Sequence, residues 1–251
     1  PRLLKKIADL LEHELRWDEA ADFWVHLCEI TKPNANIHLR IGLCRLRHND
    51  DGRAARAEFE KALEIEPDHE AATFALAERL DYEGEFDEVI SRLERLAKAR
   101  PDSARVPLTL ANFLGKYDRI DEAILQWRNG LAKEPKWDDS WRNLGFGLEH
   151  RDRIDEAVDA YRQAAQAAPA NSENHRYLGS ALQDAGQLDK ALDAFGQAIK
   201  ADPENAEAHW GRFWVSALRG DFPKAWEDYE WRWKLRERTT PELDDSAPLW
   251  E

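Results

Sequence analysis

Six prolines recur at one fixed interval along this chain, and their spacing limits the folds that the chain can adopt. They are Pro33, Pro67, Pro101, Pro135, Pro169 and Pro203, each 34 residues after the one before. Proline lacks the amide hydrogen that a helix interior needs, and its ring clashes with the preceding turn, so each proline marks the end of a helix. A 34-residue unit punctuated in this way predicts a helix–turn–helix repeat.

The units can be aligned by numbering each one so that its proline is position 32. Residues at the same position of successive units then form columns, and several of these columns predict how the two helices of one unit pack. Position 20 is small in nearly every unit: Ala55, Val89, Ala123, Ala157, Ala191 and Ala225. Position 24 is large: Phe59, Leu93, Trp127, Tyr161, Phe195 and Tyr229. Position 8 of the first helix is again small: Ala77, Ala111, Gly145 and Gly179. Because small residues let helices approach and large ones fill the space beside them, these columns predict the core.

One column also lies in the expected turn between the two helices. It carries residues that tolerate the left-handed conformation at a helix end: Gly84, Asp118, Asp152, Gly186 and Gly220. An acidic pair begins three residues later: Asp87-Glu88, Asp121-Glu122 and Asp155-Glu156. We expect these acids to cap the second helix and to complement the positive end of its dipole.

The pattern resembles the tetratricopeptide repeat family, most clearly in the sixth unit. That unit carries His175, Leu178-Gly179, Leu182, Gly186, Ala191, Phe195, Ala198 and Pro203 where the family pattern wants them. The resemblance implies an all-α fold, a right-handed superhelical solenoid of about seven hairpins. The expected repeats are about 1–34, 35–69, 70–103, 104–137, 138–171, 172–205 and 206–239. In the second repeat, Gly42 indicates a one-residue shift of the first helix. Residues 240–251 are expected to be a tail or a linker toward a further domain.

The resemblance also implies a concave wall, lined by positions 2, 5, 6, 9, 12 and 13 of each first helix. The residues predicted to form a partner-binding groove there are Phe74, Tyr82, Arg105, Leu108, Asn112, Arg142, Asn143, Phe146, Arg176, Trp210 and Trp214. Aromatic and arginine side chains are enriched at binding hot spots, so the expected ligand is an extended segment of a protein or peptide partner. In the alternative, Phe74 and Trp210 only pack between adjacent helices, and the arginines are solvated.

Two known binding modes of the family do not match these positions. The clamp that holds a chaperone tail wants a lysine where Leu108 stands, and basic residues where Glu173 and Tyr177 stand. The asparagine ladder of O-GlcNAc transferase-like arrays repeats asparagine at position 6, but only Asn143 occurs there. Any ligand is therefore expected to be held by different contacts.

Composition argues against several other classes of protein. A formal net charge of −14 opposes nucleic-acid binding, which needs a basic stripe, and no apolar run reaches the length of a membrane span. Cys28 and Cys44 are expected to be reduced thiols in the core of a cytoplasmic protein. The histidines and cysteines lack metal-ligand spacing, and the periodic Asp-Glu pairs read as helix starts. We expect no catalytic residue, metal or cofactor, so this stretch is not predicted to be an enzyme.

The C-terminal segment resembles the end of the repeat array in bacterial proteins that continue into an O-GlcNAc transferase-like glycosyltransferase domain. The resemblance rests on Gly220-Asp221-Phe222, on Trp226, on the run 229–233 and on Pro248-Leu249-Trp250. Trp226, Tyr229 and Trp233 are expected to share one face of the final helix, while Trp231 points elsewhere. An apolar helix of this kind is normally covered on both sides, so these four residues are predicted to form an interdomain cap. In the alternative, residues 240–251 fold back over it.

Two functions of different class follow. In the first, the array is the acceptor-protein recognition arm of a bacterial protein glycosyltransferase and packs against its own C-terminal catalytic domain. In the second, it is a free-standing adaptor that assembles a multiprotein complex. The sequence does not identify the partner, the sugar donor or the oligomeric state.

Overall fold

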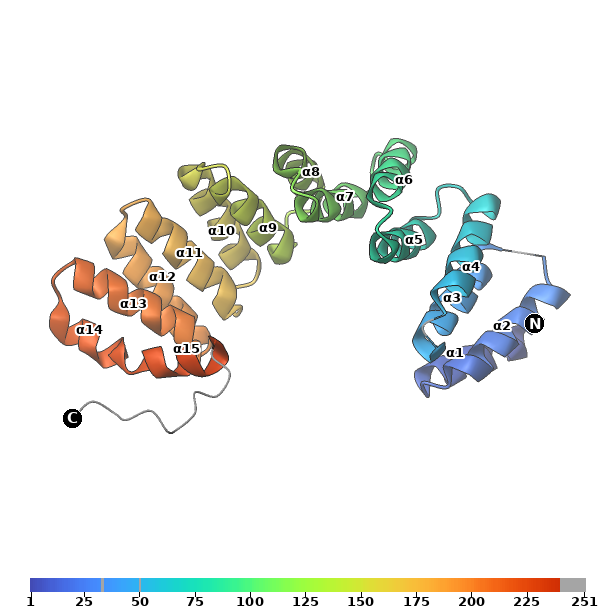
Figure 1. Ribbon diagram of the computed structural model, residues 1–251, viewed down its shortest axis with the longest axis horizontal. Coiled ribbons are helices and arrows are strands. Elements are labelled where there is room, and N and C mark those ends of the chain that lie inside the picture. The colour runs from blue at the N-terminus through green and yellow to red at the C-terminus, as the bar shows by residue number, and fades with distance from the viewer. Residues whose placement is uncertain (33, 50, 240–251) are drawn as a thin grey trace. The chain divides into compact units, whose positions relative to one another are not determined.

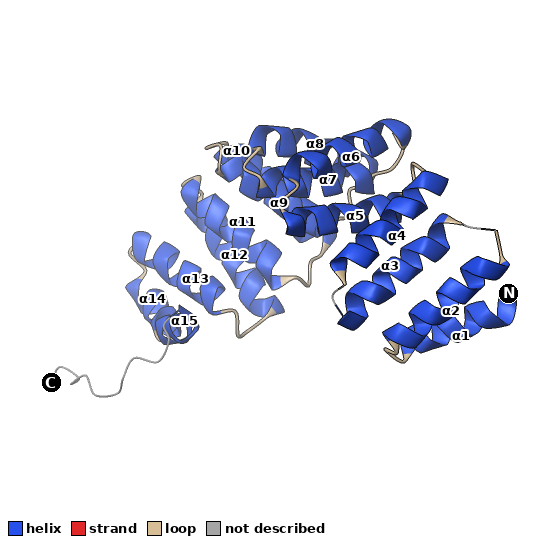
Figure 2. Cartoon of the chain, turned by 45° about the vertical axis from the view of Figure 1, so that its right-hand side comes forward, coloured by secondary structure: helices blue, strands red, loops and turns tan. Residues whose placement is uncertain are grey.

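The computed structural model describes residues 1–32, 34–49 and 51–239, and within these ranges every regular element is an α-helix. Figure 2 shows the helices and the short loops between them. The first helices of the successive hairpins are α1 (Arg2–His13), α3 (Ala35–Asn49), α5 (Glu70–Glu83), α7 (Arg105–Lys116), α9 (Asp138–Glu149), α11 (Ser172–Asp184) and α13 (Ala206–Leu218). The second helices are α2 (Trp17–Ile30), α4 (Gly52–Ile65), α6 (Phe86–Ala99), α8 (Ile120–Lys133), α10 (Ile154–Ala167), α12 (Leu188–Ala201) and α14 (Phe222–Tyr229), and α15 (Trp231–Thr239) follows.

The chain divides into two compact units, Pro1–Glu122 and Ala123–Glu251, and the boundary lies within α8. In the first unit, each helix from α1 to α6 packs on the next one in sequence. In the second unit, each helix from α9 to α13 does the same, and α15 packs on α13 (Figure 1). Helix α11 also contacts both α9 and α13, so the three first helices of this unit lie side by side. We refer to the solvent-facing side of α9, α11 and α13 as the A-helix face.

The predicted core columns are confirmed except at Tyr229, which is half-buried. All six residues of position 20 are buried, and so are Phe59, Leu93, Trp127, Tyr161 and Phe195 of position 24. A Cβ added to Gly145 would lie 2.6 Å from the ring of Tyr161, and one added to Gly179 would lie 2.8 Å from the ring of Phe195. Gly42 faces Phe59 in the same way, one place earlier in its repeat, which confirms the predicted shift. The small residues therefore leave the space that the large ring of the partner helix fills.

The turns and the prolines also lie where the sequence predicts them. Gly84, Asp118, Asp152, Gly186 and Gly220 all have φ between 56° and 80°. Each described proline of the 34-residue series stands two residues after the end of α4, α6, α8, α10 or α12. Pro33 lies outside the described residues. The first hairpin departs from the pattern, because Leu15 adopts a φ of 61° there.

The acidic pairs of α6 and α10 do not occupy the N-cap positions, which corrects the expectation that they cap these helices. Asp87-Glu88, Asp121-Glu122 and Asp155-Glu156 lie inside the first turn, and the residues at the N-caps of α6 and α10 make no side-chain capping bond. In the first turn a carboxylate complements the positive end of the helix dipole. Instead, Arg119 and Arg153 donate to Glu122 and Glu156 three residues later.

The final helix is not continuous, which corrects the prediction of one helix. It ends at Tyr229, and α15 starts at Trp231 after Glu230. Residues 240–251, which include Leu249 and Trp250, lie outside the described residues, so neither reading of the tail is tested.

Candidate functional site: the A-helix face and the C-terminal cap

Two exposed aromatic side chains stand at equivalent positions of the A-helix face. Phe146 on α9 is 60% exposed, and Trp214 on α13 is 47% exposed. Both occupy position 9 of their repeats, with Ser180 of α11 at the same position between them. Single exposed apolar residues are common on protein surfaces, but two large rings that recur at one position of the same face form an apolar surface that a partner can cover. The sequence-predicted residues Phe146 and Trp214 therefore lie on one open surface.

The two predicted arginines of this unit are held by neighbours rather than free in solvent. Arg142 pairs with Asp139 and donates to Asn174 Oδ1 on α11 at 3.0 Å. Arg176 is only 17% exposed, pairs with Glu173 at 2.7 Å and lies over the ring of Tyr177 at 3.9 Å. The charge of each guanidinium group is thus already paired with a neighbouring carboxylate, and the two side chains contribute mainly to the packing of the A-helix face.

Trp210 is half-buried in a group of rings that support Trp214. It stacks on Phe213 at a centroid distance of 4.8 Å and meets Trp214 edge-on at 5.5 Å. Asn143 is half-buried beside Arg142 on α9. These contacts fix the orientation of the Trp214 ring while part of it remains open to solvent.

Carboxylates on this face have shifted pKa values. Burial raises the pKa of Glu149 above its usual range, and the charge of Asp184 adds to this, although the Tyr161 hydroxyl donates to Glu149 at 2.8 Å and opposes the shift. Burial alone would raise the pKa of Glu173 too, but hydrogen bonds and charge from Arg176 hold it below its usual range. A ligand on this face would thus meet one fully ionised carboxylate and one that gains a proton more readily.

In the first unit the predicted groove residues differ from one another in exposure and in neighbouring side chains. Phe74 is half-buried with Arg105 above its ring at 5.3 Å, and Tyr82 is exposed with Arg79 at 4.7 Å. Asn112 is exposed on α7. These cation–π pairs hold the aromatic rings of α5 at the surface.

Leu108 does not line a surface, which corrects its assignment to the groove. Its side chain is 1% exposed. It stands at position 5, where Arg142, Arg176 and Trp210 also stand, and each of those is only half-buried. At this position a long side chain can extend past the neighbouring helix, whereas a leucine is too short and stays within the core.

The predicted interdomain cap is divided by the break at Glu230. Trp226 and Trp233 are exposed, and Tyr229 packs against Phe213 at 5.5 Å. Trp231 does not point away from the repeat but stacks on His209 at 3.8 Å with an angle of 4° between the planes. Trp226 and Trp233 alone therefore remain as open aromatic residues of the four.

Sequence reasoning missed a set of polar links between successive hairpins. Asn171 and Asn205 each cap the helix that follows, and each also donates to the preceding first helix, at Asp138 and Ser172. In the same unit, ring nitrogens of Trp141, His175 and His209 bond the carbonyls of the repeat prolines Pro135, Pro169 and Pro203. The 34-residue spacing of these residues was the signal that could have revealed them.

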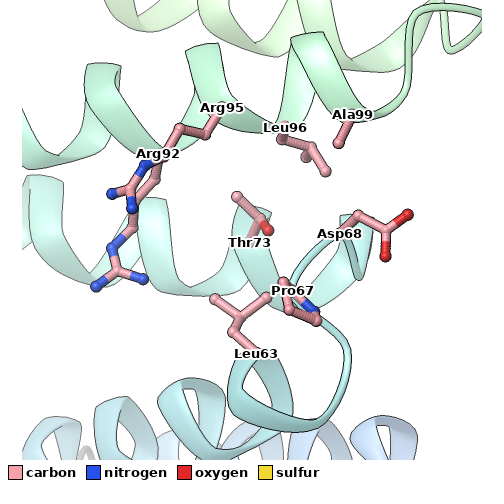
Figure 3. Close-up of a pocket in the computed structure, with 8 residues that line it drawn as sticks. All are labelled: Leu63, Pro67, Asp68, Thr73, Arg92, Arg95, Leu96 and Ala99. Carbon is pink, nitrogen blue, oxygen red and sulfur yellow. The ribbon is translucent and has the colours of Figure 1, made fainter.

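A separate cavity of about 300 Å³ lies in the first unit between α4, α5 and α6 (Figure 3). Figure 3 shows Arg92 and Arg95 at one end, with Leu96 and Ala99 along α6. Arg92 Nε lies 2.6 Å from Glu88 Oε1 without forming a directed hydrogen bond. None of the residues predicted for partner binding lines this cavity.

Metal and membrane features are absent from the described part of the chain. No group of three or more histidine, cysteine, aspartate or glutamate residues there could hold a metal ion. None of the helices in residues 1–32, 34–49 and 51–239 combines the length and the apolar character that crossing a bilayer requires. Both cysteines are free thiols, Cys44 buried and Cys28 half-buried rather than in the core as expected.

Comparison with known proteins supports the repeat assignment. The tetratricopeptide repeat family matches residues 178–230, and no curated protein sequence matches the chain. The C-terminal part of a TPR repeat-containing protein from Cytophaga hutchinsonii superposes with a TM-score of 0.72 at 12% identity, over 90% of this chain and 93% of that one. MamA from Desulfovibrio magneticus RS-1 gives 0.59 at 20% identity, over 68% and 96%. YrrB, a TPR protein with an unusual peptide-binding site, gives 0.59 at 18% identity, over 75% and 96%. Residues 178–230 are thus tetratricopeptide repeat sequence, and the helical hairpins of the chain have the fold of solved TPR proteins.

Proposed function

We propose that this chain is a protein-binding scaffold and that its A-helix face holds an extended segment of a partner. The observation that carries the proposal is the pair of exposed rings, Phe146 and Trp214, at equivalent positions of α9 and α13. On this face the proposed site further includes Arg142, Asn143, Arg176 and Trp210. The first unit carries its own candidate residues, Phe74, Tyr82, Arg105 and Asn112.

The chemistry of the face favours a peptide over a small molecule. Its two rings are separated by a whole repeat, and polar side chains lie between them, so a ligand must be long enough to cover both. Burial of each ring supplies apolar energy, and the surrounding amide and carboxylate groups can bond a backbone. YrrB, which shares the fold, is a protein with a peptide-binding site, and this likeness supports a peptide ligand here.

The test is a titration of a partner, first identified by capture from the source cell, against the variant Phe146→Ala plus Trp214→Ala. We expect affinity to fall by about tenfold or more, because hot-spot truncations typically cost over 1 kcal/mol each. Leu125→Ala is the matched control, since Leu125 is an exposed apolar residue on α8 and off this face. Equal affinity of the double variant and the control would remove both rings from the site. Charge reversal of Arg176 is a poorer test, because its mostly buried ion pair would also be broken.

We further propose, as the finer function, that the scaffold is the acceptor-recognition arm of a bacterial protein glycosyltransferase. The C-terminal segment resembles the end of the repeat array in bacterial proteins that continue into an O-GlcNAc transferase-like domain, which supports this proposal. The exposed rings of Trp226 and Trp233, which a following domain would cover, support it further. In the alternative proposal, the array is a free-standing adaptor of a multiprotein complex.

The full-length gene separates the two, since only the first requires a nucleotide-sugar-binding domain after residue 251. In that full-length protein, Trp226→Ala plus Trp233→Ala should lower transfer to the protein acceptor and weaken association of the two parts in trans. Trp231 is left intact because its ring packs inside the repeat. Wild-type transfer together with wild-type association would show that no domain docks on these rings.

A further inference from the structure

Three side chains from the first two hairpins form a relay that neither the repeat fold nor partner binding requires. Cys28 on α2 is half-buried, and its Sγ lies 3.6 Å from Nε2 of His38 on α3. Nδ1 of His38 lies 2.7 Å from Oε2 of Glu58 on α4. A thiol, an imidazole and a carboxylate in this order match the arrangement in which a base activates a nucleophile and a third group orients the base.

Glu58 is built to remain ionised. Its side chain is only 6% exposed, and Lys61 and Arg45 approach Oε1 at 2.8 Å and 3.4 Å while Oε2 faces His38. Burial alone would raise the pKa of Glu58, but the hydrogen bonds from His38 and Lys61 lower it below its usual range. The carboxylate therefore accepts, and Nδ1 of His38 must donate to it.

This bond fixes the role of the other ring nitrogen. When the ring carries a single proton, that proton sits on Nδ1, so Nε2, which faces Cys28, has the lone pair. Burial and the charge of Glu58 raise the pKa of the Cys28 thiol, so the resting sulfur carries its proton and donates to Nε2. Reactivity must then come from proton transfer to His38 as the sulfur attacks.

Cys44 provides an internal contrast within the same unit. It is buried, and its sulfur donates to Glu12 Oε1 at 3.6 Å. Burial and Glu12 together raise the pKa of Cys44 to about 12. Cys44 differs from Cys28 in two ways: its side chain is only 1% exposed, so a reagent in solvent does not reach the sulfur, and its sulfur faces a carboxylate rather than an imidazole.

We propose that Cys28 is a modification site for small hydroperoxides, with His38 as the proton shuttle and Glu58 as the residue that positions it. The sulfur attacks one oxygen of the peroxide, the O–O bond breaks, and the thiol proton passes through Nε2 of His38 to the leaving oxygen. The products are a sulfenic acid on Cys28 and water or an alcohol, so the sulfur is oxidised and the peroxide is reduced. This reaction needs only one group that transfers the proton, His38, and a small reagent. Acyl transfer, the other reaction that such a triad performs, would also need hydrogen-bond donors that stabilise an oxyanion.

The experiment treats the intact chain with hydrogen peroxide, traps sulfenic acid with dimedone and quantifies each cysteine by mass spectrometry. We expect Cys28 to be trapped about tenfold faster than Cys44 and about tenfold faster than Cys28 in the urea-unfolded chain, because a positioned base contributes at least this much. The comparison with the unfolded chain needs no variant. If native Cys28 reacts no faster than unfolded Cys28, the proposal is overturned.

Two variants then assign the roles. His38→Gln and Glu58→Gln should each slow trapping of Cys28 at least about fivefold and flatten its dependence on pH, with helicity retained by circular dichroism. His26→Gln is the matched control, since His26 on α2 pairs with Glu29 at the exposed surface and should leave the rate unchanged. A folded His38→Gln variant that keeps the wild-type rate would remove the shuttle.

Discussion

Nδ1 of His209 lies 2.6 Å from Oδ1 of Asp228, and this contact ties the last hairpin together. Its other ring nitrogen bonds the carbonyl of Pro203, and neither acceptor can donate in return. Both ring nitrogens of His209 thus face acceptors, and the ring bridges α14 and the loop before α13. Asp228, which is 2% exposed, also receives Arg212 at 2.6 Å, and Trp231 covers the face of the imidazole.

Loss of the Asp228 charge should therefore loosen the whole C-terminal cap. We expect Asp228→Asn to lower the stability of α13–α15 by about 3 kcal/mol, because Arg212 loses its buried counter-charge and one of the two oxygens it donates to. Amide hydrogen exchange over residues 206–239 measures this locally, since each repeat contacts only its neighbours. Asp189→Asn is the control, because Asp189 pairs with Arg219 in an exposed position. A change within about 0.5 kcal/mol in both variants would mean that the buried network adds no stability.

Leu15 occupies the left-handed region that glycine or aspartate occupies in five later hairpins. A branched side chain there costs about 1–2 kcal/mol, and the side chain of Leu15 is exposed, so little burial is lost with it. We expect Leu15→Gly to raise stability in urea by about 1 kcal/mol. Leu10→Gly, at an exposed site within α1, should instead lower it by about 1 kcal/mol. A loss of stability in both variants would contradict the backbone argument.

The periodic features of the fold could be predicted because each is local or repeats in sequence. The turn glycines, the small and large columns and the prolines all recur at 34 residues, and the structure confirms them. Leu15 escaped because the first repeat departs from the register. The break at Glu230 was not predicted because residues 229–233 contain no glycine or proline, and their alternating aromatic and charged side chains fit either a continuous or a broken helix.

The candidate site was less predictable for a physical reason. Family positions identify which side of a helix faces the groove, but side-chain length and neighbours decide what is exposed there. Leu108 and Phe146 were both assigned to the wall, yet one is buried and the other open. The relay at Cys28 joins residues from three helices, and no short motif records it.

The glycines in the middle of the first helices should resist replacement, whereas a glycine elsewhere should not. Gly179→Ala would place a Cβ 2.8 Å from the ring of Phe195, and we expect it to cost about 1–3 kcal/mol through overpacking. Gly196→Ala, in α12, would meet nothing within 4 Å and should add about 0.5–1 kcal/mol through helix propensity. Chemical unfolding of both variants measures the difference. Equal gains would show that the Phe195 ring moves aside freely.

The buried carboxyl of Glu149 should give the second unit a measurable dependence on pH. Burial raises its pKa in the folded state, so the folded chain binds the proton more readily than the unfolded chain does. The free energy of unfolding therefore falls as the pH rises from the ordinary pKa of glutamate, which holds in the unfolded chain, through the raised pKa of the folded chain. Above the raised pKa the loss of stability is complete. Glu149→Gln removes this dependence, so the variant should gain stability relative to the wild type between pH 4 and pH 7. Tyr161→Phe should act oppositely, because it removes the hydroxyl that donates to the ionised carboxylate and so raises the pKa further. Urea unfolding of the three proteins at both pH values measures the effect, and a Glu149→Gln difference that does not change with pH would contradict the raised pKa.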